Sequence, residues 1–163
     1  MSSVENTGER KIVTFLLGKQ MFGIDMSALI EIREWEEPTP LPSVPAHIKG
    51  VTNLRGHVVP VVGLAERLGW APSVLHSRSC ILVVNIGGKH AGFLVDEVAD
   101  IVAVDEGSIQ PAPSVESFES GVISGLVQVG QRSSEGAEDK EQTMVSLLDL
   151  ETLSPTRHMD LAA

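Results

Sequence analysis

The stretch Phe15–Ile32, FLLGKQMFGIDMSALIEI, recurs in altered form as VNIGGKHAGFLVDEVADI at Val84–Ile101. Each copy predicts a strand, a tight turn, a second strand, a short bend with an acid, and a third strand. The chain is therefore predicted to contain two similar β units of about 70 residues each. Four pairs at a constant offset of 69 mark the alignment: Gly18 with Gly87, Gly23 with Gly92, Leu29 with Val98, and Ile32 with Ile101.

Outside the repeat, the chain continues in short apolar runs rich in β-branched residues and separated by turn residues. HVVPVV (57–62), CILVVNI (80–86) and MVSLLDL (144–150) are examples. Only GLAERLG (63–69) has the spacing of a helix, and it is short. The pattern predicts an all-β fold of small barrels or sandwiches with short helices. Two such units gain stability by packing on a shared hydrophobic core.

The predicted boundaries follow from these runs. Residues 1–10 and 154–163 lack periodicity and are predicted to be a disordered N-terminus and a flexible tail. The ordered domain is predicted to span 11–153, with a first β subdomain at about 11–76 and a second at about 77–153. The polar segment 131–142 interrupts the second unit and is predicted to be a surface loop.

Composition excludes several classes of function. The net charge of −10 repels phosphate backbones and anionic lipid, and 4% aromatic residues offer little for base stacking, so no nucleic-acid binding is expected. No apolar run is long enough to cross a membrane, and the N-terminus is unlike a secretory signal, which predicts a cytoplasmic protein without direct membrane insertion. The single cysteine, Cys80, lies in an apolar run and is expected to be a small core residue.

No catalytic, metal or cofactor site is predicted. The five histidines include no close pair at metal-ligand spacing along the chain. IGGKH (86–90) departs from the spacing of a phosphate loop, and GVISG (121–125) misplaces its serine for a nucleophile elbow. Ordinary turns account for both. An enzyme of unrecognised type remains the alternative from a different class.

Arg55 stands out because it precedes an apolar strand and lies in VTNLR, which Gly50 and Gly56 flank. The glycines allow sharp turns at both ends and close approach of other backbone. A guanidinium must be paired or exposed, so Arg55 either forms a structural salt bridge or presents a donor fork at a binding groove.

The segment HIKGVTNLRGHVVPVVGLAERLG (47–69) resembles the signature of the CheW family of bacterial chemotaxis adaptors. GIDMSALIEIRE (23–34), GFLVDEVADIVAV (92–104) and IQPAP (109–113) are similar to further segments of that family. The resemblance covers about Lys11–Leu153. It implies two SH3-like five-stranded barrels on a common core, no catalysis, no cofactor, and a scaffold that bridges the histidine kinase CheA to the cytoplasmic tips of chemoreceptors. Its location would be cytoplasmic, associated with receptor arrays through these partners.

The resemblance also implies a receptor-binding groove between the barrels, in which an acid and an arginine face each other. By position, the groove residues are Leu29, Glu31, Gly50, Arg55, Cys80 and Gly92. Two departures stand out. Gly63 replaces a common aspartate and leaves the capping of the following helix open, and the insert 131–142 is longer than the usual hairpin.

Two related roles stay open beside the chemotaxis adaptor. A similar adaptor of a twitching-motility or surface-sensing pathway would have the same fold. A CheV-type protein adds a receiver domain, and the chain's end at Ala163 disfavours it.

Overall fold

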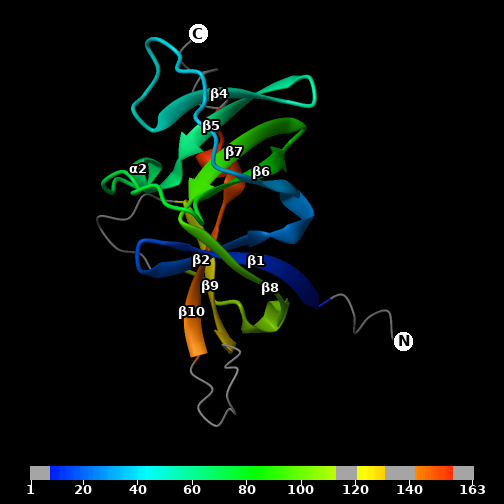
Figure 1. The fold of residues 1–163 in the computed structure, drawn as a ribbon. Helices are drawn as coiled ribbons and strands as arrows, with labels where there is room; N and C mark the ends of the chain where they lie inside the picture. Colours follow the sequence, from blue (N-terminus) through cyan, green and yellow to red (C-terminus); the bar gives the residue numbers. More distant parts are fainter. Residues whose placement is uncertain (1–7, 113–120, 131–141, 156–163) are drawn as a thin grey trace.

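The computed structural model describes residues 8–112, 121–130 and 142–155, which form ten strands in two five-stranded sheets (Figure 1). The first sheet has the order β8 (Glu97–Asp105), β1 (Glu9–Leu17), β2 (Gln20–Asp25), β10 (Gln142–Leu148) and β9 (Ile123–Gly130). The second has the order β3 (Leu29–Glu34), β6 (Cys80–Ile86), β7 (Lys89–Val95), β5 (His57–Gly63) and β4 (Ile48–Leu54). The helices are short: η1 (Met26–Ala28), α2 (Leu64–Arg67), η2 (Glu106–Ser108) and α3 (Leu150–Leu153).

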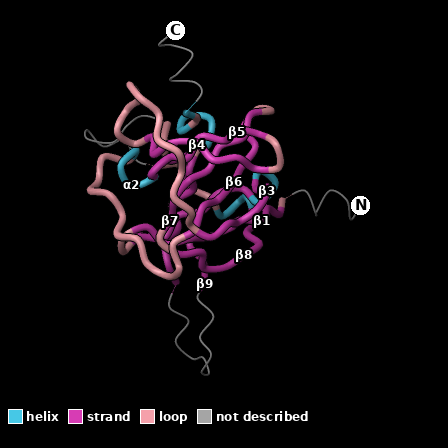
Figure 2. The backbone as a smooth tube through the Cα atoms, turned by 45° about the horizontal axis from the view of Figure 1, so that its top comes forward, coloured by secondary structure: helices cyan, strands magenta, loops and turns pink. Residues whose placement is uncertain are grey.

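Each sheet curls into a barrel because the chain beyond one edge strand pairs with the other edge. After β3, Thr39 bridges to Val51 of β4, with two backbone hydrogen bonds of 2.8 Å. After β8, Gln110 bridges to Leu126 of β9 in the same manner. Figure 2 shows strands and loops dominating the described chain. The all-β fold of two SH3-like barrels with short helices is confirmed.

The barrels do not follow the predicted division at residues 76 and 77, and that boundary is wrong. The first barrel combines β1 and β2 with β8–β10, whereas the second combines β3–β7, so each half of the chain contributes strands to both (Figure 1). Only Asp96 separates β7 from β8. A hairpin needs at least two linking residues, so β8 continues into the other barrel and pairs with β1.

The internal repeat is visible in the backbone. Gly18 and Gly87 both have positive φ, 64° and 59°, in the turns of the hairpins β1–β2 and β6–β7. Gly23 and Gly92 each lie where two strands run parallel. A Cβ at either glycine would meet an isoleucine methyl at 2.7 Å, and these isoleucines, Ile12 and Ile81, are also equivalent in the repeat.

Alternate residues of β6 serve two different cores. Val83 is 1% exposed and packs inside the second barrel with Val59 and Val61. Leu82 and Val84 point the other way, into the largest cluster, which includes residues of both barrels. The shared core therefore joins the two barrels through strands that are buried on both faces.

Replacing Val83 with alanine is expected to lower the free energy of unfolding by about 1 to 4 kcal/mol, because it leaves a cavity inside the second barrel. Val58, 68% exposed on β5, is the matched control, and its alanine variant is expected to change stability by no more than about 0.5 kcal/mol. Urea denaturation of both variants measures the difference. Equal midpoints would contradict the inward orientation of Val83.

The predicted ends of the domain need correction at three places. Residues 8–10 are ordered, and β1 begins at Glu9 because Glu9 pairs with Asp105. Ser154, predicted to begin the tail, is buried after α3. Gln142, predicted to end the surface loop, belongs to β10 and faces Gly130. Residues 1–7, 131–141 and 156–163 lie outside the described residues.

The two short helices begin differently. Asp149 caps α3, and its Oδ1 accepts from Glu151 N at 3.0 Å. At the corresponding place before α2, Gly63 offers no side chain. A Cβ at Gly63 would overlap Glu66 Oε1, an oxygen that Lys49 Nζ contacts at 2.7 Å. Glu66 therefore supplies the negative charge near the start of α2 in place of an aspartate.

Changing Gly63 to aspartate is expected to destabilise the protein by about 1 kcal/mol, because the new carboxylate displaces Glu66 from Lys49 and repels it. In a Glu66→Gln background the same change is expected to be neutral or stabilising, since the introduced aspartate then acts as the N-cap. Thermal unfolding of the four proteins measures both effects. An equal loss of stability in the two backgrounds would contradict the inference that the Glu66 carboxylate takes the place of an N-cap aspartate.

Candidate receptor-binding site

All six residues of the predicted groove lie on the second barrel. Leu29 and Glu31 are on β3, Gly50 on β4, Arg55 in the β4–β5 turn, Cys80 on β6 and Gly92 on β7. Cys80 belongs to the core shared by the barrels, and Leu29 packs against that core. The other four residues, Glu31, Gly50, Arg55 and Gly92, lie around the interior of the second barrel itself.

The acid and the arginine meet, as the resemblance implied. Arg55 Nη2 lies 3.0 Å from Glu31 Oε1, although Glu31 is on β3 and Arg55 follows β4, which are the two opposite edge strands of the sheet. Arg33 Nη1 also contacts Glu31, at 3.3 Å from Oε2. The Glu31 side chain is 21% exposed and that of Arg55 is 75% exposed. The acid is thus largely enclosed, whereas the Arg55 guanidinium faces solvent.

The Arg55–Glu31 contact is an ion pair without an aligned hydrogen bond. Glu31 Oε1 is buried, and no donor among the described residues hydrogen-bonds to it. The N–H groups of Arg55 therefore remain available to a carboxylate or carbonyl of a partner. Both roles considered for Arg55, structural pairing and a donor fork at a surface, are compatible with this geometry.

The turn holds Arg55 in an uncommon backbone conformation. Arg55 has φ of 51° and Gly56 has φ of 84°, the two positive values that a type I′ hairpin turn requires. Gly56 N donates to Asn53 Oδ1 at 3.1 Å. A residue other than glycine, asparagine or aspartate is uncommon in this left-handed region, and such positions often serve function.

Gly50 and Gly92 shape the backbone rather than provide contacts. Gly50 lies inside β4 at a bulge, not at a turn, with φ of 145°. A Cβ there would overlap the backbone oxygen of Thr39, the residue that closes the barrel. Sequence reasoning correctly identified Gly50 as a place of close backbone approach but placed it in a turn.

Cys80 is a free, buried cysteine, 8% exposed, as expected for a core residue. Burial raises the pKa of its thiol above the ordinary value. The Val98 backbone N–H lowers this pKa, and the negative charge of Glu97 raises it further. The thiol is therefore protonated and unreactive at neutral pH.

The sequence-based site omits exposed apolar residues on the two outer strands β3 and β8. Ile30 and Ile32 are 38% and 44% exposed on β3, and Ile101 is 48% exposed on β8. Ile32 and Ile101 are equivalent in the repeat, which is the sequence signal that could have identified them. Exposed isoleucines on edge strands are typical of surfaces that bind another protein.

In the described part of the chain, no three His, Cys, Asp or Glu side chains are grouped to hold a metal ion. Two histidines do come together: His57 and His90 stack edge to face with ring centroids 5.5 Å apart. They are far apart in the sequence, so spacing along the chain did not reveal the pair. None of the described helices is long and apolar enough to span a bilayer.

Comparisons with known proteins agree with this geometry. Residues 11–157 match the profile of the CheW-like domain. The probable chemotaxis protein CheW of Rhizobium etli is 36% identical over 91% of this chain and 89% of its own length. Chemotaxis protein CheW of Rhizobium meliloti is 34% identical over 95% and 94%. The crystal structure of the scaffolding protein TtCheW from Thermoanaerobacter tengcongensis superposes with a TM-score of 0.74, 30% identity, and coverage of 86% and 84%.

The matched region includes every described strand from Lys11 onward, and the fold is shared with a solved scaffolding protein at 30% identity. The chain therefore belongs to the CheW-like domain family and is a scaffold of the chemotaxis type.

Proposed function

We propose that this protein is a non-catalytic adaptor that couples the cytoplasmic tips of chemoreceptors to the histidine kinase CheA. The observation that carries this proposal is the exposed Arg55 guanidinium, anchored on the largely enclosed Glu31 of the second barrel. The pairing keeps the guanidinium in one place while its donors remain accessible. Such an arrangement presents fixed hydrogen-bond donors to a partner.

The receptor is proposed to bind along the second barrel, against Arg55 and the exposed isoleucines of β3. A helix of the receptor can lay apolar residues on Ile30 and Ile32 while a carboxylate or a carbonyl reaches Arg55. Apolar contacts supply affinity in this arrangement, and the guanidinium supplies register.

The kinase is proposed to bind through its regulatory domain. The resemblance to the CheW family implies that this domain has the same fold as the present chain. The protein would then be cytoplasmic and associated with receptor arrays through its two partners. Its net charge of −10 supports attachment through proteins, since anionic lipid would repel it.

An adaptor of a related chemosensory pathway is the second candidate. Protein PilI of Pseudomonas aeruginosa is 35% identical over 53% of this chain and 48% of its own length. The same partner classes would apply, with a different receptor and a different kinase.

Reconstitution of the three components tests the proposal. The purified chain is titrated, by calorimetry, with a soluble receptor fragment and separately with the regulatory domain of CheA, both from the same organism. Binding of both, together with receptor-dependent stimulation of kinase autophosphorylation that requires the chain, is the expected result. Binding of neither partner would refute the proposal. Binding only to components of a twitching or surface-sensing system would select the second candidate.

A matched pair of variants tests the surface. Ile32→Glu, on β3, is expected to abolish receptor binding, whereas Val58→Glu, at a more exposed position of the same barrel, is expected to preserve it. Both positions are exposed, so both proteins should fold. Equal loss in the two variants would exclude β3 as the receptor surface.

A further inference from the structure

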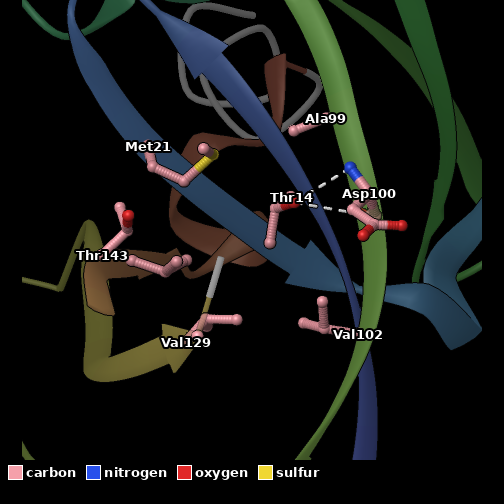
Figure 3. A pocket seen from close by; sticks show the side chains of 9 residues that line it. Thr14, Met21, Ala99, Asp100, Val102, Val129 and Thr143 are labelled. Atoms are coloured by element: carbon pink, nitrogen blue, oxygen red, sulfur yellow. Dashed lines mark hydrogen bonds between the residues drawn. The ribbon is translucent and has the colours of Figure 1, made fainter. Parts of the chain in front are cut away.

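The mouth of the first barrel contains a cavity of about 350 Å³ that opens between β8 and the β9–β10 hairpin (Figure 3). Its walls include the apolar side chains of Met21, Val102, Val129 and Val145. Asp100 and Thr143 contribute polar groups to its lining. This volume is in the range that accepts a side chain or a small ligand.

The internal repeat relates this mouth to that of the second barrel. Asp100 pairs across the sheet with Thr14, and Glu31 pairs with Val83, the repeat equivalent of Thr14. Each acid also follows a β-bulge at the same step of its edge strand, at Ala99 and Ile30. Asp100 is therefore the counterpart of Glu31.

The opposite wall corresponds in the same way. Val129 pairs with Thr143, one step before the last described pair of β9 and β10, Gly130 with Gln142, and Leu54 pairs with His57 next to the β4–β5 turn. Gly130 thus follows Val129 where Arg55 follows Leu54. Met21 stands in the position of His90, which is its equivalent in the repeat.

The two mouths differ in what fills them. In the second barrel, Arg55 contacts Glu31, and His57 stacks on His90. In the first barrel, Gly130 has no side chain, and Thr143 and Met21 line the cavity without filling it. Asp100 forms no ion pair with any residue that the structure describes, and its Oδ1 accepts only the Ile101 N–H, at 2.8 Å. The Thr14 hydroxyl already forms hydrogen bonds with the backbone O and N of Asp100, as the dashed lines of Figure 3 show.

From this contrast we propose that the mouth of the first barrel binds an arginine side chain of a partner protein. The guanidinium pairs with Asp100, as Arg55 pairs with Glu31, and the aliphatic stem lies against Met21, Val129 and Val145. Charge favours this occupant, since the chain carries a net charge of −10. The site is on the other barrel from the proposed receptor surface and is independent of it.

Methyl NMR of the full-length chain tests the proposal, with N-acetyl-arginine amide as the probe. Saturable shifts of the Met21, Val102, Val129 and Val145 methyl signals are expected. N-acetyl-citrulline amide, which has the same shape without the charge, should bind at least about fivefold more weakly, as should the arginine probe to an Asp100→Asn variant. Equal shifts with citrulline, or no shift of these methyl groups, would overturn the proposal.

A second variant fills the site from within. Thr143 is partly exposed and lines the cavity, so Thr143→Arg should fold and abolish binding of the probe. Undiminished binding to this variant would count against the assigned mouth.

Two further measurements distinguish the source of the arginine. In the first, residues 131–141 are replaced by Asn-Gly, a turn that can join Gly130 to Gln142, its partner in the strand pair. If the probe binds only to this shortened chain, the natural arginine belongs to this chain, and the proposal is overturned. Dimerisation that Asp100→Asn abolishes would assign it to a second copy, with the same consequence. A monomer that binds the probe with segment 131–141 intact supports a partner protein.

Discussion

Reversing the charge of Arg55 by glutamate is expected to leave the protein folded but to weaken receptor binding by several kcal/mol. The pair is solvent-accessible on the arginine side, and such pairs contribute only about 0 to 1 kcal/mol to stability. At the interface, a receptor group would meet a carboxylate beside the acid of Glu31, and juxtaposed like charges are strongly unfavourable there. Binding of the kinase regulatory domain, if it uses another surface, should change far less.

Titration of the Arg55→Glu protein against a receptor fragment and against the kinase domain measures both effects. Arg78→Glu is a suitable control, because Arg78 has a similar exposure, 70%, and also contacts a glutamate, Glu97, at 3.0 Å. Receptor binding equal to that of the unmodified protein would remove Arg55 from the proposed surface.

Pairing between Glu31 and Arg55 is better tested with neutral variants than with a charge swap. Arg33 also contacts Glu31, so an arginine at position 31 would meet Arg33 and could not restore the original balance. A cycle of Glu31→Gln, Arg55→Gln and the double variant avoids this repulsion. A coupling energy in receptor binding, with little coupling in unfolding, is expected if the pair serves recognition.

Replacing Gly50 with alanine is expected to lower the free energy of unfolding by about 3 kcal/mol or more. The added Cβ would overlap Thr39 O and lie 2.7 Å from Thr39 C, both backbone atoms that cannot move without breaking the bridge to Val51. The φ of 145° adds backbone strain to any residue with a side chain. Any loss of receptor binding in this variant should therefore follow the loss of folded protein.

Gly107→Ala provides the control for Gly50→Ala. Beyond its neighbours in the chain, a Cβ at Gly107 would meet only Asp105 Oδ2, at 4.0 Å, so the change should alter stability by no more than about 0.5 kcal/mol. Chemical denaturation and receptor titration of both variants separate the two possible roles. A stable Gly50→Ala protein that fails to bind the receptor would place Gly50 at the interface itself.

Local patterns in the sequence predicted much of the fold. The run CILVVNI coincides with β6, and GLAERLG contains α2, because alternation of apolar residues and the positions of glycine depend only on neighbours in the chain. The internal repeat was correct to the level of single glycines. For the proposed site, the family signature predicted the contact between Glu31 and Arg55, which spacing alone had left as one of two alternatives.

Other features required partners that are distant in sequence. The one-residue link at Asp96 determines that β8 leaves the barrel of β7, but the pairing of β8 with β1 is seen only when both halves are folded together. The meeting of His57 with His90 and the approach of Thr39 to Gly50 likewise join separate strands.

By itself, the sequence determined which segments are strands, where the chain turns, and that two similar units occur, because these properties arise from periodicity and turn chemistry within a few residues. Only the tertiary structure decided which barrel each strand joins, that backbone of Thr39 lies too close to Gly50 for a side chain, and that a cavity lies beside Asp100 among the described residues of the first barrel. These outcomes depend on cross-strand register and on contacts between the two halves of the chain, and the sequence of either half alone does not specify them.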